Sequence, residues 1–151
     1  MLSWRSCSRR VSLPGRETWA MRRRTGRALA LLVVARLLVR RARFSSWRAH
    51  LGLAGTADRA QALEARQLGR HVERAASRLP GTSKCLPQAM ALSWMLRARQ
   101  IPHQVALMVR PMAARGGLDD LHAMVRCGDQ IVLGNISGPW IETLVLPFRD
   151  W

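Results

Sequence analysis

A cysteine at the start of a predicted helix is the residue of this sequence best suited to covalent chemistry. Cys85 begins a helix predicted over residues 85–99, and Lys84 precedes it. Unpaired backbone N–H groups, the helix dipole and a neighbouring positive charge all stabilise a thiolate at such a position. The N–H groups of Cys85 and Leu86 can also donate to the oxyanion that forms when an amide carbonyl is attacked. We therefore predict that Cys85 is a nucleophile and that the backbone of Cys85 and Leu86 forms an oxyanion hole. The alternative is an inert cysteine that fills part of the core.

A thiolate nucleophile needs a base within hydrogen-bond reach, and the sequence has four histidines. His50 lies in a weakly patterned segment, and His71 is expected to face solvent on a helix. His103 is expected to be exposed at the start of a strand. His122 lies inside a strand predicted over 121–126, where a side chain can be held in one place. We therefore predict that His122 is the general base.

The hairpin that contains His122 also suggests a residue to orient it. If residues 128–129 form a two-residue turn, counting back along the two strands places Asn135 directly opposite His122, on the same side of the sheet. Asn135 could then accept a hydrogen bond from one ring nitrogen and leave the other for Cys85, which is the Cys-His-Asn arrangement of papain-like enzymes. A longer turn would shift this pairing by a residue. The fallback orienting residues are carboxylates in nearby loops, Asp119, Asp120 and Asp129.

Hydrophobic periodicity predicts the elements that position these side chains. Helices are expected first and strands afterwards, which predicts an α+β fold with N-terminal helices packed on a small antiparallel sheet. Thr56 is a possible N-cap for the second helix. The expected helices cover residues 26–43, 57–79 and 85–99, and the expected strands cover 103–110, 121–126, 130–135 and 140–148.

The chain length of 151 residues fits one domain with an extension. Residues 1–25 are expected to be disordered, or to result from a start codon assigned too early. Residues 26–50 are expected to form a basic apolar helix and a connector. Residues 51–151 are expected to form the domain that carries the chemistry.

Charge and cysteine usage exclude several classes of function. Residues 1–50 hold thirteen Arg and one acidic residue, so they carry most of the formal net charge of +16. They nevertheless lack the interleaved aromatic residues of a nucleic-acid-binding domain. The scattered cysteines, Cys7, Cys85 and Cys127, match neither a disulfide framework nor a zinc site, so no metal is expected. The segment 26–43 is too short and too charged to span a bilayer. We expect it to pack on the domain or a partner, with peripheral contact to an anionic membrane as the alternative.

Three segments together resemble the leader-peptidase protein of lasso peptide biosynthesis, a bacterial branch of the transglutaminase-like superfamily. They are RLPGTSKCLPQA at 78–89, ALSWMLRARQIPHQVALMV at 91–109 and LHAMVRCGDQIVLGN at 121–135, and the resemblance covers roughly residues 56–148. The sequence departs from the family pattern at four positions. Gln100 stands where Gly is common, Met124 replaces Trp, Arg126 replaces Glu, and Asn135 stands where the family has Asp.

The resemblance implies a papain/transglutaminase-like fold with the nucleophilic cysteine at a helix N-terminus. It implies a cytoplasmic cysteine peptidase, without a cofactor, that removes the leader from a ribosomally made precursor peptide through a Cys85 thioester. It also implies two partner proteins, a small separate leader-recognition protein and an ATP-dependent cyclase that closes a macrolactam ring. The helix at 26–43 or an edge of the sheet could dock the recognition protein.

Two other readings of the sequence stay open. The same site could transfer the acyl group to an amine instead of water. Alternatively, the chain could be a non-catalytic relative or a basic membrane- or nucleic-acid-binding module, which the arginine-rich first 50 residues suggest.

Overall fold

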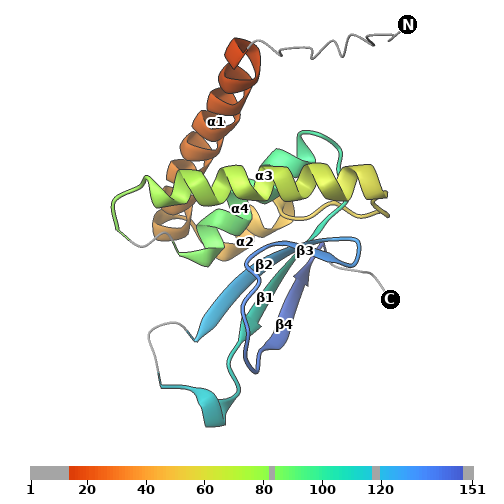
Figure 1. The fold of residues 1–151 in the computed structure, drawn as a ribbon. Helices are drawn as coiled ribbons and strands as arrows, with labels where there is room; N and C mark the ends of the chain where they lie inside the picture. The colour runs from red at the N-terminus through yellow and green to blue at the C-terminus, as the bar shows by residue number, and fades with distance from the viewer. Residues whose placement is uncertain (1–13, 82–83, 117–119, 148–151) are drawn as a thin grey trace, which may run out of the picture.

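The computed structural model describes residues 14–81, 84–116 and 120–147. Helices come first along the chain and strands second, as Figure 1 shows. Cys7, Asp119 and the last residue of the strand expected over 140–148 lie outside the described residues. The helices are α1 (Pro14–Arg41), α2 (Phe44–Trp47), α3 (Arg59–Ser77) and α4 (Cys85–Arg97), with short 3-10 turns η1 (Arg48–His50) and η2 (Met112–Ala114). The strands are β1 (Gln104–Val109), β2 (Leu121–Cys127), β3 (Gln130–Leu133) and β4 (Ile141–Leu146).

The four strands form one antiparallel sheet in the order β3-β2-β1-β4. Since β3 and β4 lie at opposite edges, residues 134–140 must cross from one edge to the other. The helices cover one face of the sheet in two layers (Figure 1): α3 and α4 pack on β2 and β3, and α1 packs on α3 and α4. The predicted α+β architecture, with helices on a small antiparallel sheet, is confirmed.

A local sequence signal sets the start of α3, which lies with α4 between α1 and the sheet. Asp58, not Thr56, caps α3: its carboxylate accepts from the Gln61 N–H, and the Gln61 side chain accepts from the Asp58 N–H. Gly69 lets α3 approach the sheet closely, because a Cβ atom there would stand 2.3 Å from the carbonyl oxygen of Val132. The α3 helix is thereby pressed against the edge of the sheet that leads to Asn135.

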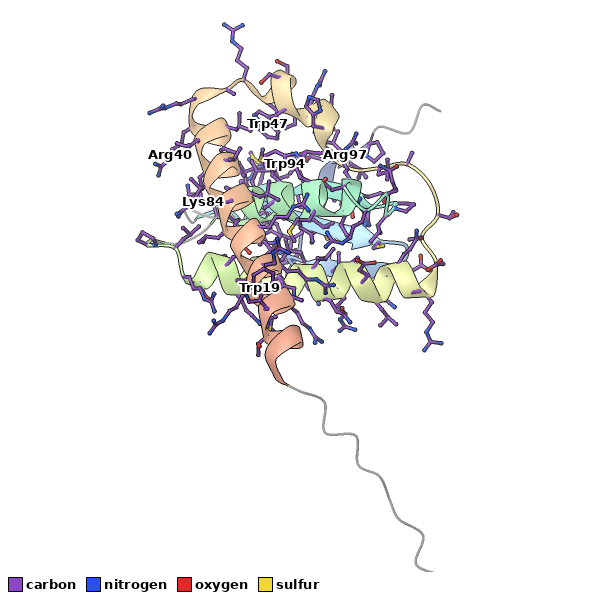
Figure 2. The ribbon with its side chains drawn as sticks, turned by 90° about the horizontal axis from the view of Figure 1, so that it is seen from above. Trp19, Arg40, Trp47, Lys84, Trp94 and Arg97 are labelled. Carbon is purple, nitrogen blue, oxygen red and sulfur yellow. The ribbon has the colours of Figure 1, made fainter. Side chains whose placement is uncertain are left out.

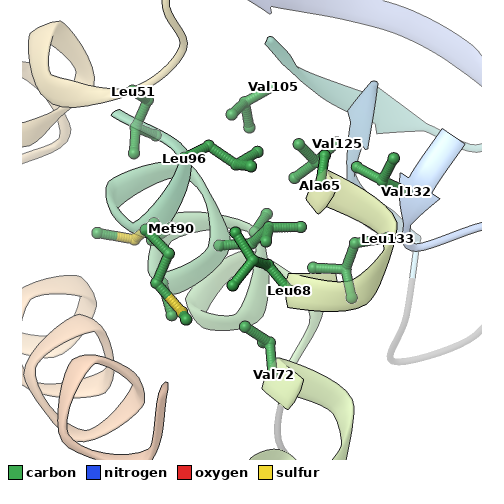
Figure 3. Packing of buried hydrophobic residues seen from close by; sticks show 14 of the residues in the cluster. Leu51, Ala65, Leu68, Val72, Met90, Leu96, Val105, Val125, Val132 and Leu133 are labelled. Atoms are coloured by element: carbon green, nitrogen blue, oxygen red, sulfur yellow. The ribbon is translucent and has the colours of Figure 1, made fainter. Parts of the chain in front are cut away.

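The main core lies between the helices and the inner face of the sheet (Figure 3). Its centre is α4, an apolar helix buried on several sides, as expected for a helix between two layers. A second, smaller cluster of Ala106, Met108 and Met124 lies on the outer face, together with Trp140 and Val145 from the last part of the chain. Largest among the fully buried side chains of the main core are Leu32, Leu51, Leu68, Met90, Leu92, Met95, Leu96 and Ile101.

The N-terminal helix is longer than expected. It begins at Pro14, so residues 14–25, which we expected in a disordered stretch, are helical. Thr25 is buried and its Oγ1 shares a 3.0 Å hydrogen bond with Nδ1 of His71 on α3. Among the described residues, no helix combines the length and the apolar character that crossing a membrane requires.

Two histidines that we expected to face solvent are buried. His71 is 5% exposed, because its side of α3 packs against α1. His103 is 2% exposed; its Nδ1 donates to the Ile101 carbonyl at 2.8 Å, and its Nε2 lies 2.8 Å from the Ser93 hydroxyl on α4. Burial lowers the pKa of both imidazoles, and nearby arginines lower it further. Both histidines are therefore structural links between elements.

Candidate active site

The predicted nucleophile stands at a helix start, as expected. Cys85 is the first residue of α4, and Lys84 occupies the N-cap position with an extended backbone. The side chain of Lys84 makes no capping hydrogen bond with this helix. The thiol is half-buried, and its Sγ lies 3.8 Å from the carbonyl oxygen of Leu121, the residue before His122. The cysteine therefore reaches the beginning of β2.

The predicted base is anchored by a backbone carbonyl. His122 lies near the start of β2, and its Nε2 is 2.7 Å from the carbonyl oxygen of Gly134. A carbonyl oxygen can only accept, so Nε2 carries the hydrogen of this bond. In the neutral ring Nδ1 then keeps its lone pair, and it is the nitrogen available to take a proton.

The predicted pairing of His122 with Asn135 is wrong by one residue. Arg126 pairs with Ile131 as counted, but Val125 pairs with Leu133, because a bulge leaves Val132 without an opposite partner. Continued past this bulge, the register would set Ile136 opposite His122, but β3 ends at Leu133. The Gly134 carbonyl oxygen is reached by the His122 side chain and not through the strand pairing. The two-residue turn was correct, and the irregularity lies inside the ladder.

Gly134 is a residue of the candidate site that the sequence analysis did not name. Its φ is +77°, a value that favours glycine, and a Cβ atom there would stand 2.6 Å from the Ala123 carbonyl oxygen and 3.1 Å from His122 Nε2. A glycine at the end of a predicted strand can signal a bulge or a close backbone approach, which is the signal that could have found it. Only glycine lets the carbonyl sit this close to the imidazole.

One cavity of about 220 Å³ brings the three predicted side chains together. Cys85 and Gln88 come from α4, Glu73 from α3, His122 from β2, and Asn135 from the segment after β3. Glu73 and Gln88 were not predicted; they add a carboxylate and an amide to the wall. The remaining lining residues are Ala123, Leu133 and Gly134.

An indole ring lies beside the histidine. Trp140 stacks at a tilt of 46° with its ring centre 5.5 Å from that of His122, and Arg110 places its guanidinium 4.9 Å from the indole centre. The tryptophan comes from the end of the segment that crosses the sheet, so it arrives at β2 only in the folded chain. It limits the rotation of the imidazole, because an aromatic contact of this kind is lost if the ring turns away.

The other candidate residues lie away from this cavity. Neither Asp120 nor Asp129 lines it; Asp129 lies at a larger hollow of about 1070 Å³, beside His103 at the opposite end of the sheet. Cys127 is buried, its thiol lies 3.3 Å from the Pro102 carbonyl oxygen, and burial raises its pKa, so it stays a thiol. Among the residues described, no three His, Cys, Asp or Glu side chains gather as metal ligands would.

Comparison with known proteins assigns the family. No curated protein and no solved structure matches the chain at a significant level. The family model described as the transglutaminase-like superfamily matches residues 28–140, which include the second half of α1, Cys85, His122 and Asn135. Members of this superfamily are generally cysteine proteases or transglutaminases, in agreement with a cysteine and a histidine in one cavity. Because the match covers most of the sequence, the chain belongs to the transglutaminase-like superfamily.

Proposed function

We propose that this protein is a cysteine peptidase that removes the leader from a ribosomally made precursor peptide during lasso peptide maturation. The observation that carries the proposal is the shared cavity of Cys85 and His122, in which the anchored Nε2 leaves Nδ1 for the thiol. The three sequence segments around these residues support the leader-peptidase branch of the family.

The proposed reaction follows from the roles of these atoms. The Cys85 thiol passes its proton to Nδ1 of His122, and the thiolate attacks the scissile carbonyl carbon. The carbonyl oxygen becomes an oxyanion, which the N–H groups of Cys85 and Leu86 stabilise. The C–N bond then breaks, and the leaving amine takes the proton from His122, which leaves a thioester on Cys85.

Hydrolysis of the thioester completes the cycle. Water gives a proton to Nδ1 of His122 and attacks the thioester carbon, and the new carboxyl group leaves as the thiolate recovers its proton. The Gly134 carbonyl holds the imidazole through both stages and stabilises the imidazolium through a charge-assisted hydrogen bond. We propose that the precursor arrives bound to a separate leader-recognition protein and passes to an ATP-dependent cyclase.

The test is cleavage of the cognate precursor, taken as the short peptide encoded beside this gene, with its recognition protein present. We expect the native chain to release leader and core peptides of the predicted masses. Cys85→Ala should lower the rate by about a thousandfold or more, because the nucleophile is removed. Cys127→Ser is the matched control: it changes a cysteine outside the cavity and should leave cleavage within a few-fold wherever circular dichroism shows a folded chain.

Two outcomes would contradict the proposal. Undiminished cleavage by Cys85→Ala would remove the nucleophile from the mechanism. A product that carries an added amine, in reactions that contain peptide and an amine together, would assign the site to acyl transfer instead of hydrolysis.

A further inference from the structure

The outward side of α1 carries an apolar stripe that the fold does not use. The helix packs on the domain through Thr25, Ala28, Leu32 and Ala35, which are all buried and are spaced three or four residues apart. On the opposite side, a second set of apolar residues recurs with helical spacing. We call it the outer stripe, and it consists of Trp19, Ala30, Val33, Val34 and Leu37.

The outer stripe is continuous over the two turns from Ala30 to Leu37, and Trp19 lies three turns before them on the same side. Val33, Val34 and Leu37 are between 43% and 47% exposed, and Trp19 is 60% exposed. Trp19 precedes Ala30 by eleven residues, or about three turns, so it lies on the same side. Figure 2 looks down on α1, with Trp19 on its N-terminal half and Arg40 near its C-terminal end. The tryptophan end of the helix projects past α3 and α4 in Figure 1.

Exposed arginines border the stripe on both sides. At about 100° per residue, Arg22 and Arg40 lie at one edge of the stripe and Arg27 at the other, while Arg23 and Arg41 lie within it, between the directions of Ala30 and Val34. The only acidic residue within the span of α1 is Glu17. The guanidinium of Arg23 lies 4.5 Å from the centre of the Trp19 ring. The exposed side of α1 therefore combines a two-turn apolar surface, exposed arginines beside and within it, and an indole nearer the N-terminus.

We propose that α1 lies flat on the surface of an anionic lipid bilayer, with the outer stripe among the acyl chains and the arginines at the phosphates. Amphipathic helices that bind in the interface plane have this combination of basic and aromatic residues. Tryptophan is favoured at that depth, since its ring is apolar and its N–H is polar. The helix lies on the bilayer and does not cross it, because Arg36 interrupts its apolar sequence.

Charge favours a bilayer over a second copy of this chain. Two α1 helices joined through their outer stripes would bring the arginines beside and within both stripes together, with no row of carboxylates to balance them. An anionic lipid surface offers both an apolar layer and a dense set of negative charges. The proposal is independent of the peptidase assignment, because Cys85 and His122 play no part in it.

The test is sedimentation of the full chain with vesicles of phosphatidylcholine, with and without one third phosphatidylglycerol. We expect the anionic vesicles to bind at least about tenfold more protein, and added salt to weaken the binding. Val34→Asn with Leu37→Asn should lower the partition coefficient at least about tenfold, and so should Arg40→Gln with Arg41→Gln. The matched controls lie on α3: Leu63→Asn replaces an exposed leucine, and Arg66→Gln with Arg70→Gln removes two exposed arginines.

Three results would overturn the proposal. The first is equal binding to neutral and anionic vesicles. The second is a loss of binding with the α3 control variants as large as with the α1 variants, because the protein would then bind through its general charge. The third is a dimer in vesicle-free solution that Val34→Asn with Leu37→Asn dissociates, which would assign the outer stripe to a second copy.

Discussion

At the scale of single residues, the contact with most consequence for the chemistry joins His122 Nε2 to the Gly134 carbonyl oxygen at 2.7 Å. A backbone carbonyl does not titrate and carries no full charge. It therefore orients the ring without adding an ionisable group to the site. The cavity also contains Asn135, whose side chain is then available for substrate or for a second contact with the ring.

Gly134→Ala should damage turnover more than binding. The added Cβ atom would stand 3.1 Å from Nε2 and 2.6 Å from the Ala123 carbonyl oxygen, so the imidazole or the strand must move. A displacement of this size at a catalytic base lowers kcat by about a hundredfold. We expect KM for the precursor to change little, and steady-state kinetics would measure both. Gly116→Ala is the control, because a Cβ atom at Gly116 meets nothing within 4 Å.

The same kinetics distinguish the carbonyl from the asparagine as the orienting group. If Gly134 orients the ring, Asn135→Ala should keep more than about a tenth of the native kcat. A loss of a thousandfold with Asn135→Ala, together with a mild effect of Gly134→Ala, would instead make Asn135 the orienting group, as the sequence first suggested.

At the scale of elements, two buried histidines link segments that are distant in sequence. His71 joins α3 to α1 through Thr25, and His103 joins the start of β1 to α4 through Ser93. The Ser93 hydroxyl in turn accepts the N–H of Gly52, which connects the segment before α3 to the same network. These bonds are made by neutral imidazoles, because burial disfavours the charged form.

Stability should therefore fall with pH on the acidic side. In the folded protein the pKa values of His71 and His103 lie below the ordinary value of about 6.5, which applies to the unfolded chain. As the pH falls through that value the unfolded chain binds more protons than the folded one, so unfolding becomes more favourable. The stabilisation from the two neutral histidines is complete above the pKa that they have in the unfolded chain. It is lost as the pH falls toward their lower pKa in the folded protein.

Thermal unfolding between about pH 7.5 and pH 5 measures this effect, in the range where unperturbed histidines titrate. We expect Tm to decrease as the pH is lowered across this range, and we expect His71→Gln to make the decrease shallower. His50→Gln changes an exposed histidine and is the control. A slope that His71→Gln leaves unchanged would exclude His71 as a source of the pH dependence.

At the scale of the whole molecule, α1 is part of the domain. It forms the outer helical layer, its Ala28, Leu32 and Ala35 are fully buried, and the superfamily match begins at residue 28 within it. One face of this helix therefore contributes to the core that supports α4, while the other face remains exposed.

Leu32→Ala should destabilise the entire domain by about 3 kcal/mol, because it leaves a cavity in the core. Leu37→Ala, on the outer stripe of the same helix, should change the free energy of unfolding by less than about 0.5 kcal/mol. Urea denaturation followed by far-ultraviolet circular dichroism measures both. Equal midpoints for the two variants would mean that α1 folds separately from the rest.

Local sequence signals determined much of this protein. Cys85 at a helix start, His122 in a strand, the turn after Cys127 and the α+β order all follow from caps, breakers and periodicity, which act between residues close in sequence. Contacts between distant segments decide the contact of the His122 side chain with Gly134, the approach of Trp140, and the burial of His71 and His103. Periodicity describes one segment at a time, so only the packed tertiary structure decided which group contacts the His122 ring.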